Sequence, residues 1–246
     1  MADGFFKHIP NIEYDFKSDG KVILAKDLFR KVSTWSYLQE GVTGYSYYRI
    51  TEGERPDVVA ARLYGDSTLY WTFFLVNENL QDLSDWPKAT IEFNRFLDRK
   101  YSGTVLVASS STDIVSYNHS TNTSSKFTLG EKVSQSADIY GFVTDINPTH
   151  NRITLNSVEG TFTASGTATG ADSEKSFTIS AVHAEKDATH HYTNSNGFKT
   201  TVATGNTPVS NEEYERTVND DKFEIRYIQP AYVNRVIREF KQLVRD

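Results

Sequence analysis

The sequence of 246 residues contains no cysteine. The protein therefore forms no disulfide framework, no thiolate metal site and no cysteine nucleophile, which excludes zinc ribbons and cysteine proteases. No apolar run reaches the roughly 18 residues that a membrane-spanning helix needs, and the amino terminus lacks the basic and apolar regions of a signal peptide. We expect no membrane partner and no export by a signal peptide.

The chain also lacks an excess of positive charge. Its formal net charge is -6 and its isoelectric point lies near 5.6. Attraction to phosphate backbones normally needs a clustered basic face, and an acidic chain opposes it. We expect no nucleic-acid partner.

Motifs of catalysis are missing as well. Neither a G-x-S-x-G turn nor an H-E-x-x-H helix occurs, and the segment Gly166–Gly170 lacks the Gly-Lys-Ser/Thr end of a phosphate-binding loop. The acidic pairs Asp82/Asp85 and Asp220/Asp221 have no cleft signature around them, so we expect them to be solvated. We predict that the protein is not an enzyme and has no catalytic residue and no cofactor.

One group of histidines could in principle bind a metal. His183, His190 and His191 lie near Glu185 and Asp187 in the sequence, and imidazole and carboxylate ligands suit zinc or manganese. Adjacent histidines on a strand point to opposite faces, so at most one of His190 and His191 can join His183. We favour surface or interface histidines and predict no metal.

Apolar and aromatic residues are plentiful. Hydrophobic residues make up 38% and aromatic residues 13% of the chain, while the mean hydropathy of -0.50 is that of a protein that folds in water. The length allows one large or two small domains with a sizeable core.

Residues 48–86 alternate short strand and helix signals. Tyr48 begins a short strand, Pro56 suits the first position of a helix, and Gly65 suits its left-handed end. A second, strongly apolar helix then runs to Asn77. This stretch predicts strand, helix, helix, strand, and both helices must bury against other parts of the chain.

Composition changes near Ser102. The segment 103–205 is about one third Ser and Thr with short alternating runs, which predicts an inserted all-β sandwich or barrel of five or six strands. The segment 206–246 predicts a strand and an amphipathic helix from Pro230. We expect three parts, at 1–102, 103–205 and 206–246, with the last packing back on the first domain or on partners.

The first part resembles a known family. Its segment RPDVVAARLYGDSTLYWTFFLVNENL, followed by Asp85-Trp86-Pro87, resembles the LysM-like core (about 48–87) of a baseplate wedge subunit from contractile-tailed, T-even-type bacteriophages, and KDLFRKV at Lys26–Val32 supports this. The resemblance implies an α+β fold: a LysM-like βααβ core with flanking helices, to which the inserted all-β domain is added.

The resemblance also implies a function. The chain would be a structural subunit of the viral tail, made in the host cytoplasm, that clamps neighbouring wedge proteins around the central hub. Its partners would include the large wedge dimer and the sheath-initiating subunit, with six copies per ring.

Bulky side chains of this subunit are our candidates for the partner interface, because tryptophan and tyrosine often anchor interfaces. We expect both tryptophans of the set, and the apolar face of the last helix, to be partly exposed in the free chain. The set comprises Trp71, Trp86, Tyr70, Tyr232, Val236 and Phe240.

The alternative function is a LysM module that binds peptidoglycan or chitin. Its groove would lie between the loop after the first strand and the loop after the second helix, lined by Gly53, Glu54, Asn77 and Asn79. The absence of a signal peptide and the bulky second helix count against it.

Overall fold

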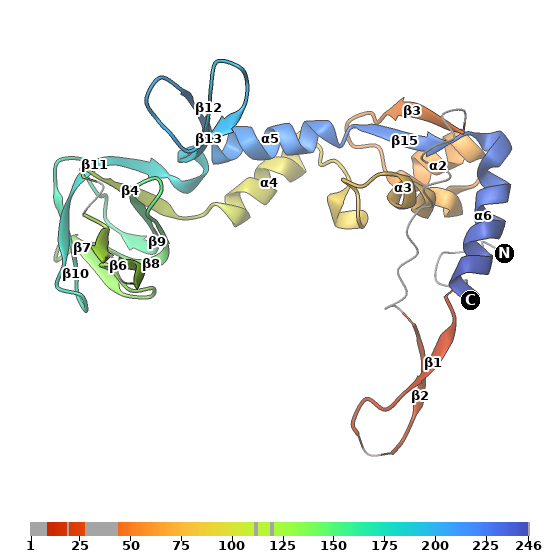
Figure 1. The fold of residues 1–246 in the computed structure, drawn as a ribbon, viewed down its shortest axis with the longest axis horizontal. Helices are drawn as coiled ribbons and strands as arrows, with labels where there is room; N and C mark the ends of the chain where they lie inside the picture. The colour runs from red at the N-terminus through yellow and green to blue at the C-terminus, as the bar shows by residue number, and fades with distance from the viewer. Residues whose placement is uncertain (1–8, 19, 28–43, 111–112, 119–120, 246) are drawn as a thin grey trace. The chain divides into compact units, whose positions relative to one another are not determined.

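The computed structural model describes residues 9–18, 20–27, 44–110, 113–118 and 121–245. The chain divides into two compact units, which we call unit 1 (residues 1–90 and 218–246) and unit 2 (residues 91–217) (Figure 1). Unit 2 is longer at both ends than the expected β insertion at 103–205. The helical residues on either side of the β-rich segment are grouped with that segment. Residues 28–32 of the Lys26–Val32 motif lie outside the described residues.

Unit 1 combines two small sheets with short helices. Its elements are the strands β1 (Asn11–Tyr14), β2 (Ile23–Lys26), β3 (Tyr45–Arg49) and β15 (Glu224–Ile228), the helices α2 (Pro56–Tyr64), α3 (Trp71–Val76) and α6 (Pro230–Arg245), and the 3-10 turns Ser67–Tyr70 and Leu83–Asp85.

The predicted limits of the first helix are confirmed. Pro56 opens α2, and Gly65 ends it at φ 73°, with its N–H donating to Ala61 O at 2.9 Å. Asp66 then accepts a hydrogen bond from Thr68 N at 2.8 Å and begins the 3-10 turn that leads into α3.

The strand predicted after the second helix is wrong. Residues Leu83–Asp85 form a 3-10 turn, and β3 instead pairs antiparallel with β15, Tyr48 lying opposite Ile225. The reason is burial, since Ile225 of β15 is fully buried and shares one face of the strand with half-buried Tyr227, so that this face covers the core. Ile225 completes a core with Ile50, Val59, Ala60, Phe73, Leu80 and Trp86.

The amphipathic last helix packs within unit 1. Val233 and Val236 of α6 are buried against Val76 and Ile228. Part of the apolar face of this helix is therefore covered by the protein's own chain, while Tyr232 stays exposed.

Unit 2 holds a closed six-stranded barrel in the order β10-β11-β4-β9-β8-β7. The barrel form of the predicted β insertion is thus observed. The barrel strands are β4 (Thr104–Ala108), β7 (Lys132–Ser136), β8 (Ile139–Asn147), β9 (Arg152–Glu159), β10 (Thr167–Gly170) and β11 (Ser176–Ala184).

The other elements of unit 2 are helices and short strands outside the barrel. They are α4 (Thr90–Lys100), α5 (Asn211–Asp221), the 3-10 turn Glu185–Asp187, β5 (Val115–Asn118), β6 (Thr121–Ser125), β12 (Thr189–Thr193), β13 (Lys199–Thr200) and β14 (Thr207–Ser210). The first residue of α4 and the end of α5 from residue 218 onward belong to unit 1. Buried Glu215 joins the two helices by accepting hydrogen bonds from Lys100 Nζ at 2.6 Å and from Tyr101 Oη at 2.8 Å.

The barrel interior is filled by alternating apolar side chains, as a small barrel requires. Phe127 and Phe177 meet edge to face at 5.5 Å between ring centroids. The buried residues of this core are Leu106, Ala108, Ile114, Phe127, Val133, Val143, Ile153, Leu155, Phe162, Ala168, Phe177 and Ile179.

The barrel has a core of its own, so we predict that it can be removed. Replacing residues 103–205 by a short Gly/Ser linker should leave the helical signal of the remainder intact, because closing a shorter loop costs less entropy. Circular dichroism of the shortened chain measures this. Loss of the helical signal would show that the two units depend on one another for folding.

We also predict that Phe73, which is fully buried, determines the stability of unit 1. Phe73→Ala should cost about 3–5 kcal/mol, since it removes an aromatic ring and leaves a cavity. Leu63→Ala should cost less than about 2 kcal/mol because Leu63 is only partly buried. Denaturant unfolding measures both. The control is Val58→Ala at an exposed position of α2, the helix that carries Leu63; equal midpoints for Phe73→Ala and the control would contradict the prediction.

Candidate protein interaction surface

Most of the predicted interface residues lie inside unit 1. Trp71 is 4% and Trp86 8% exposed, so the expectation that they are partly exposed in the free chain is wrong. Val236 and Phe240 are also buried, whereas Tyr70 is half-buried and Tyr232 is exposed. Tryptophan, which serves interfaces and cores equally well, is used here in the core.

Trp86 holds the turn after β3. Its indole Nε1 donates to Glu54 O at 2.8 Å, and its ring lies 6.0 Å from Phe73 and 6.2 Å from Phe74, measured between centroids. A buried indole needs such a partner for its N–H. Trp86 therefore fixes the Gly53–Glu54 turn to the core.

Trp71 anchors the root of the β1–β2 hairpin. Its ring lies 4.8 Å from that of Phe240, and the two form a small buried cluster with Ile9, which precedes β1. Lys26 Nζ donates to Ile9 O at 2.8 Å, and Asp27 N donates to Pro10 O at 3.0 Å. The two ends of the hairpin are thus tied together beside this cluster.

The hairpin itself carries the largest group of exposed apolar side chains in the described part of the chain. Five of the fourteen exposed large hydrophobic residues there belong to it: Tyr14, Phe16, Val22, Ile23 and Leu24. A local concentration of exposed large apolar side chains makes the hairpin a candidate interaction surface.

Both faces of the hairpin are apolar near its tip. Tyr14 pairs with Ile23, so these two share one face with the pair Ile12 and Ala25. Leu24, opposite Glu13, lies on the other face. No third strand joins this sheet among the described residues, and a lone two-stranded hairpin has marginal stability in water. A partner that covers it would stabilise it.

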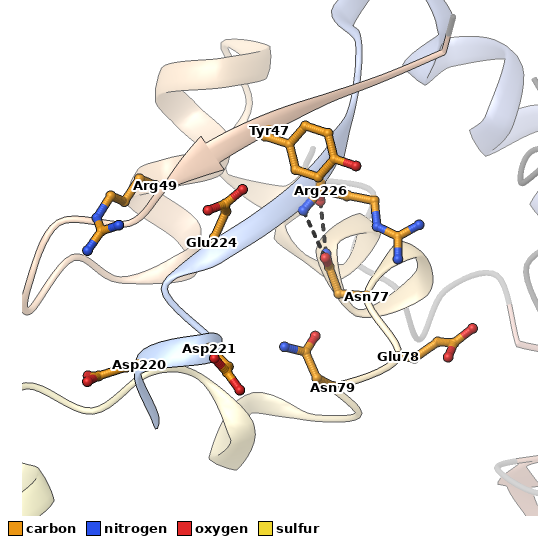
Figure 2. Close-up of a pocket in the computed structure, with 9 residues that line it drawn as sticks. All are labelled: Tyr47, Arg49, Asn77, Glu78, Asn79, Asp220, Asp221, Glu224 and Arg226. Carbon is orange, nitrogen blue, oxygen red and sulfur yellow. Dashed lines mark hydrogen bonds between the residues drawn. The ribbon is translucent and has the colours of Figure 1, made fainter. Parts of the chain in front are cut away.

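A second feature of unit 1 is a hollow of about 640 Å³ over the outer face of the β3–β15 sheet (Figure 2). Its walls come from the turn after α3 and from the end of α5. Its lining residues are Tyr47, Arg49, Asn77, Glu78, Asn79, Asp220, Asp221, Glu224 and Arg226.

Asn77 closes the edge of β15. Its Nδ2 donates to Phe73 O and to Arg226 O, both at 2.8 Å, and its Oδ1 accepts from Arg226 N at 2.8 Å. The Asn77 side chain therefore caps the end of α3 and also bonds to β15 as a neighbouring strand would. Its amide groups are used for hydrogen bonds inside the fold.

The residues proposed for a glycan groove are not brought together in this hollow. It includes Asn77 and Asn79 but neither Gly53 nor Glu54. The Glu54 carboxylate accepts from Tyr48 Oη at 2.8 Å and pairs with Arg62 at 2.7 Å. Two of the four proposed side chains, those of Glu54 and Asn77, thus serve the fold.

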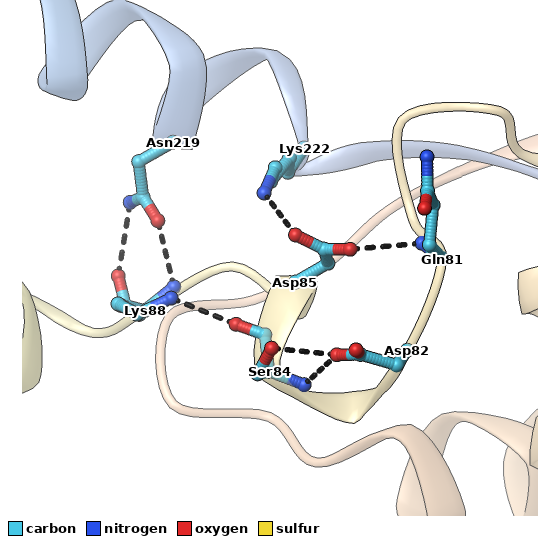
Figure 3. A network of polar contacts seen from close by, with 7 residues as sticks. All are labelled: Gln81, Asp82, Ser84, Asp85, Lys88, Asn219 and Lys222. Carbon is cyan, nitrogen blue, oxygen red and sulfur yellow. Dashed lines mark hydrogen bonds and ion pairs between the residues drawn. The ribbon is translucent and has the colours of Figure 1, made fainter.

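A polar network joins the segment after α3 to the end of α5 (Figure 3). Asp85 accepts from Gln81 N at 3.0 Å and pairs with Lys222 at 3.0 Å, while Asn219 exchanges two hydrogen bonds with the backbone of Lys88, at 2.8 and 3.1 Å. Burial raises the pKa of Asp85, but its hydrogen bonds and Lys222 outweigh this and lower the pKa overall. The acidic pair Asp82/Asp85 is therefore structural.

The structure does not bring His183, His190 and His191 together with other described ligand residues around one point. His190 stacks on Tyr214 with ring centroids 3.9 Å apart, its Nδ1 lies 2.9 Å from Nδ1 of His191, and His183 is exposed. Burial and nearby Lys199 lower the pKa of His190. Among the described residues, no group of three or more metal-ligating side chains is placed to hold an ion.

Sequence reasoning missed the exposed apolar side chains of the hairpin. The signal was present, because IEYD and VILAK alternate or cluster apolar residues on both sides of a turn with Gly20. The sequence of these two segments does not indicate whether other parts of the chain cover them. The exposure of their apolar side chains is therefore known only from the structure.

Asn77 yields a test of the edge closure. Asn77→Ala should lower the free energy of unfolding by about 1–3 kcal/mol, because it leaves buried backbone groups of Phe73 and Arg226 without partners. Chemical denaturation measures it, with Asn79→Ala as a matched control at an exposed neighbour. If both variants unfold at the same midpoint, Asn77 does not hold β15.

The sequence was compared with known proteins. Residues 1–104 match the family model described as "Base plate wedge protein 53". This match confirms the resemblance to a baseplate wedge subunit, and it supports a structural role in the phage tail and thus in the virion. A search of curated proteins found no match. None of the described helices has the length and apolar character to cross a membrane.

Proposed function

We propose, on the premise that residues 1–104 are those of a baseplate wedge protein, that the chain clamps neighbouring wedge proteins together without catalytic turnover. The β1–β2 hairpin, which lies within the matched segment, would be the gripping element. The observation that carries this is the group of five exposed apolar side chains on a hairpin whose root, Ile9, is buried against Trp71 and Phe240.

Physical chemistry favours such an element. Burying exposed apolar area contributes roughly 25 cal/mol per Å², and aromatic side chains such as Tyr14 and Phe16 make effective anchors at an interface. Because the root is fixed in the core, the ordering that binding still requires is confined to the strands of the hairpin. Six copies around a ring would multiply a modest contact into a stable assembly.

We further propose that unit 1 contains the LysM-like βααβ core, made of β3, α2, α3 and β15. Its last strand would then come from the carboxyl-terminal part of the chain, with the barrel unit inserted before it. Two observations support this arrangement: β3 pairs with β15, and α2 and α3 follow β3 in the sequence before β15 is reached. The large wedge dimer and the sheath-initiating subunit remain the partners that we propose.

The hairpin can be tested in the full chain. Phe16→Ser with Leu24→Ser should reduce incorporation into tails by about 30-fold or more, since losing an anchor costs about 2 kcal/mol. The variant is supplied to a phage whose own copy is defective, and copies per purified tail are counted by mass spectrometry.

The control removes equally exposed residues from unit 2. Phe198→Ser with Leu129→Ser is matched because Phe198 is 69% exposed against 74% for Phe16, and Leu129 is 69% exposed against 70% for Leu24. Normal incorporation of the hairpin variant would rule out the hairpin as the grip. Absence of the wild-type chain from tails would overturn the proposed function itself.

A further inference from the structure

The hollow on the β3–β15 sheet carries charges that the fold does not use. Two guanidiniums, Arg49 and Arg226, and four carboxylates line it, the latter being Glu78, Asp220, Asp221 and Glu224. None of the four carboxylates is ion-paired within the described part of the chain. Elsewhere in unit 1 the fold does use its acids, as Asp85 pairs with Lys222.

Next to the groups that Asn77 occupies, the edge of β15 borders the hollow at Glu224. Asn77 binds both backbone groups of Arg226, so these groups point away from β3. Alternate residues of a strand direct their backbone groups to the same side. The N–H and C=O of Glu224 therefore also point away from β3, toward the side of the turn after α3. An extended chain in the hollow could bond to them.

We propose that this hollow binds an extended segment of a neighbouring wedge protein that bears lysine or arginine side chains; this rests on the proposed function. The four carboxylates receive the cationic side chains, and the Glu224 backbone receives the segment's main chain by strand addition. The exposed ring of Tyr47 offers a face for a cation or an aliphatic stem. Arg49 and Arg226 reduce the net charge, so isolated basic residues fit better than an unbroken basic run.

The chemistry of the lining disfavours other occupants. A nucleic-acid phosphate would meet four carboxylates. A metal ion lacks ligands, because no group of acids in the described residues is placed to hold one. A neutral glycan would leave the unpaired charges unmatched.

The first test measures binding of a probe to the full chain. The probe is a fluorescent peptide of alternating lysine and valine, and a glutamate–valine peptide is its counterpart. The lysine peptide should bind saturably at low ionic strength. Replacing three hollow acids, by Asp220→Asn, Asp221→Asn and Glu224→Gln, should weaken it about tenfold or more.

A matched control neutralises three exposed acids of unit 2, by Glu159→Gln, Asp172→Asn and Glu174→Gln. This control should bind like the wild type. If it loses as much affinity as the hollow variant, or if the glutamate peptide binds equally well, attraction is nonspecific and the proposal is overturned. Thermal unfolding checks that both variants remain folded.

The second test separates this proposal from the proposed function. The hollow variant is supplied to the phage with the defective copy, beside the hairpin variant. Reduced incorporation of the hollow variant supports the proposal. Normal incorporation of the hollow variant together with loss of the hairpin variant overturns the hollow as a docking site and leaves the clamp function standing. Absence of the wild-type chain from tails overturns the clamp function instead.

Discussion

The pairing of β3 with β15, fixed by Asn77, is the interaction on which unit 1 depends. Asn77 and Arg226 are 149 residues apart in sequence, yet three hydrogen bonds join the Asn77 side chain to Arg226 and Phe73. Without β15 the helices α2 and α3 would lose the sheet that covers Phe73. Closing so long a loop costs little more entropy than closing a shorter one, because the cost grows only with the logarithm of length. Unit 2 can therefore be inserted in the sequence between β3 and β15. The contacts of Lys88 with Asn219 and of Asp85 with Lys222 join the segment that precedes unit 2 to the segment that follows it.

This closure decides which residues are left for binding. Since β15 leads directly into α6, Phe240 comes to lie on Trp71, and the two bury Ile9 at the root of the hairpin. Trp71 and Phe240, which would suit an interface, therefore serve to position the exposed β1–β2 hairpin. In unit 1 the large side chains of Trp71 and Phe240 therefore lie inside, whereas Tyr14 and Phe16 of the hairpin are exposed.

Local signals predicted local structure well. Pro56 and Gly65 set the limits of α2, and alternation with Ser and Thr indicated the β insertion that forms the barrel. The partner of β3 could not be predicted, because strand pairing across the insertion leaves no periodic trace. The burial of Trp71 and Trp86 could not be predicted either, since an apolar side chain looks the same in the sequence whether its own chain or a partner covers it.

The residues that match the wedge family are not the residues that form one compact unit of the fold. Residues 1–104 carry the family match, but unit 1 needs residues 218–246 for its second strand and for α6. Residues 91–104 in turn cluster with unit 2. A chain ending at residue 104 would expose Ile50 and Phe73 where Ile225 now covers them, and Trp71 where Phe240 does. The matched segment therefore shares its buried clusters with the carboxyl-terminal strand and helix, and these complete the packing around Phe73 and at the root of the hairpin.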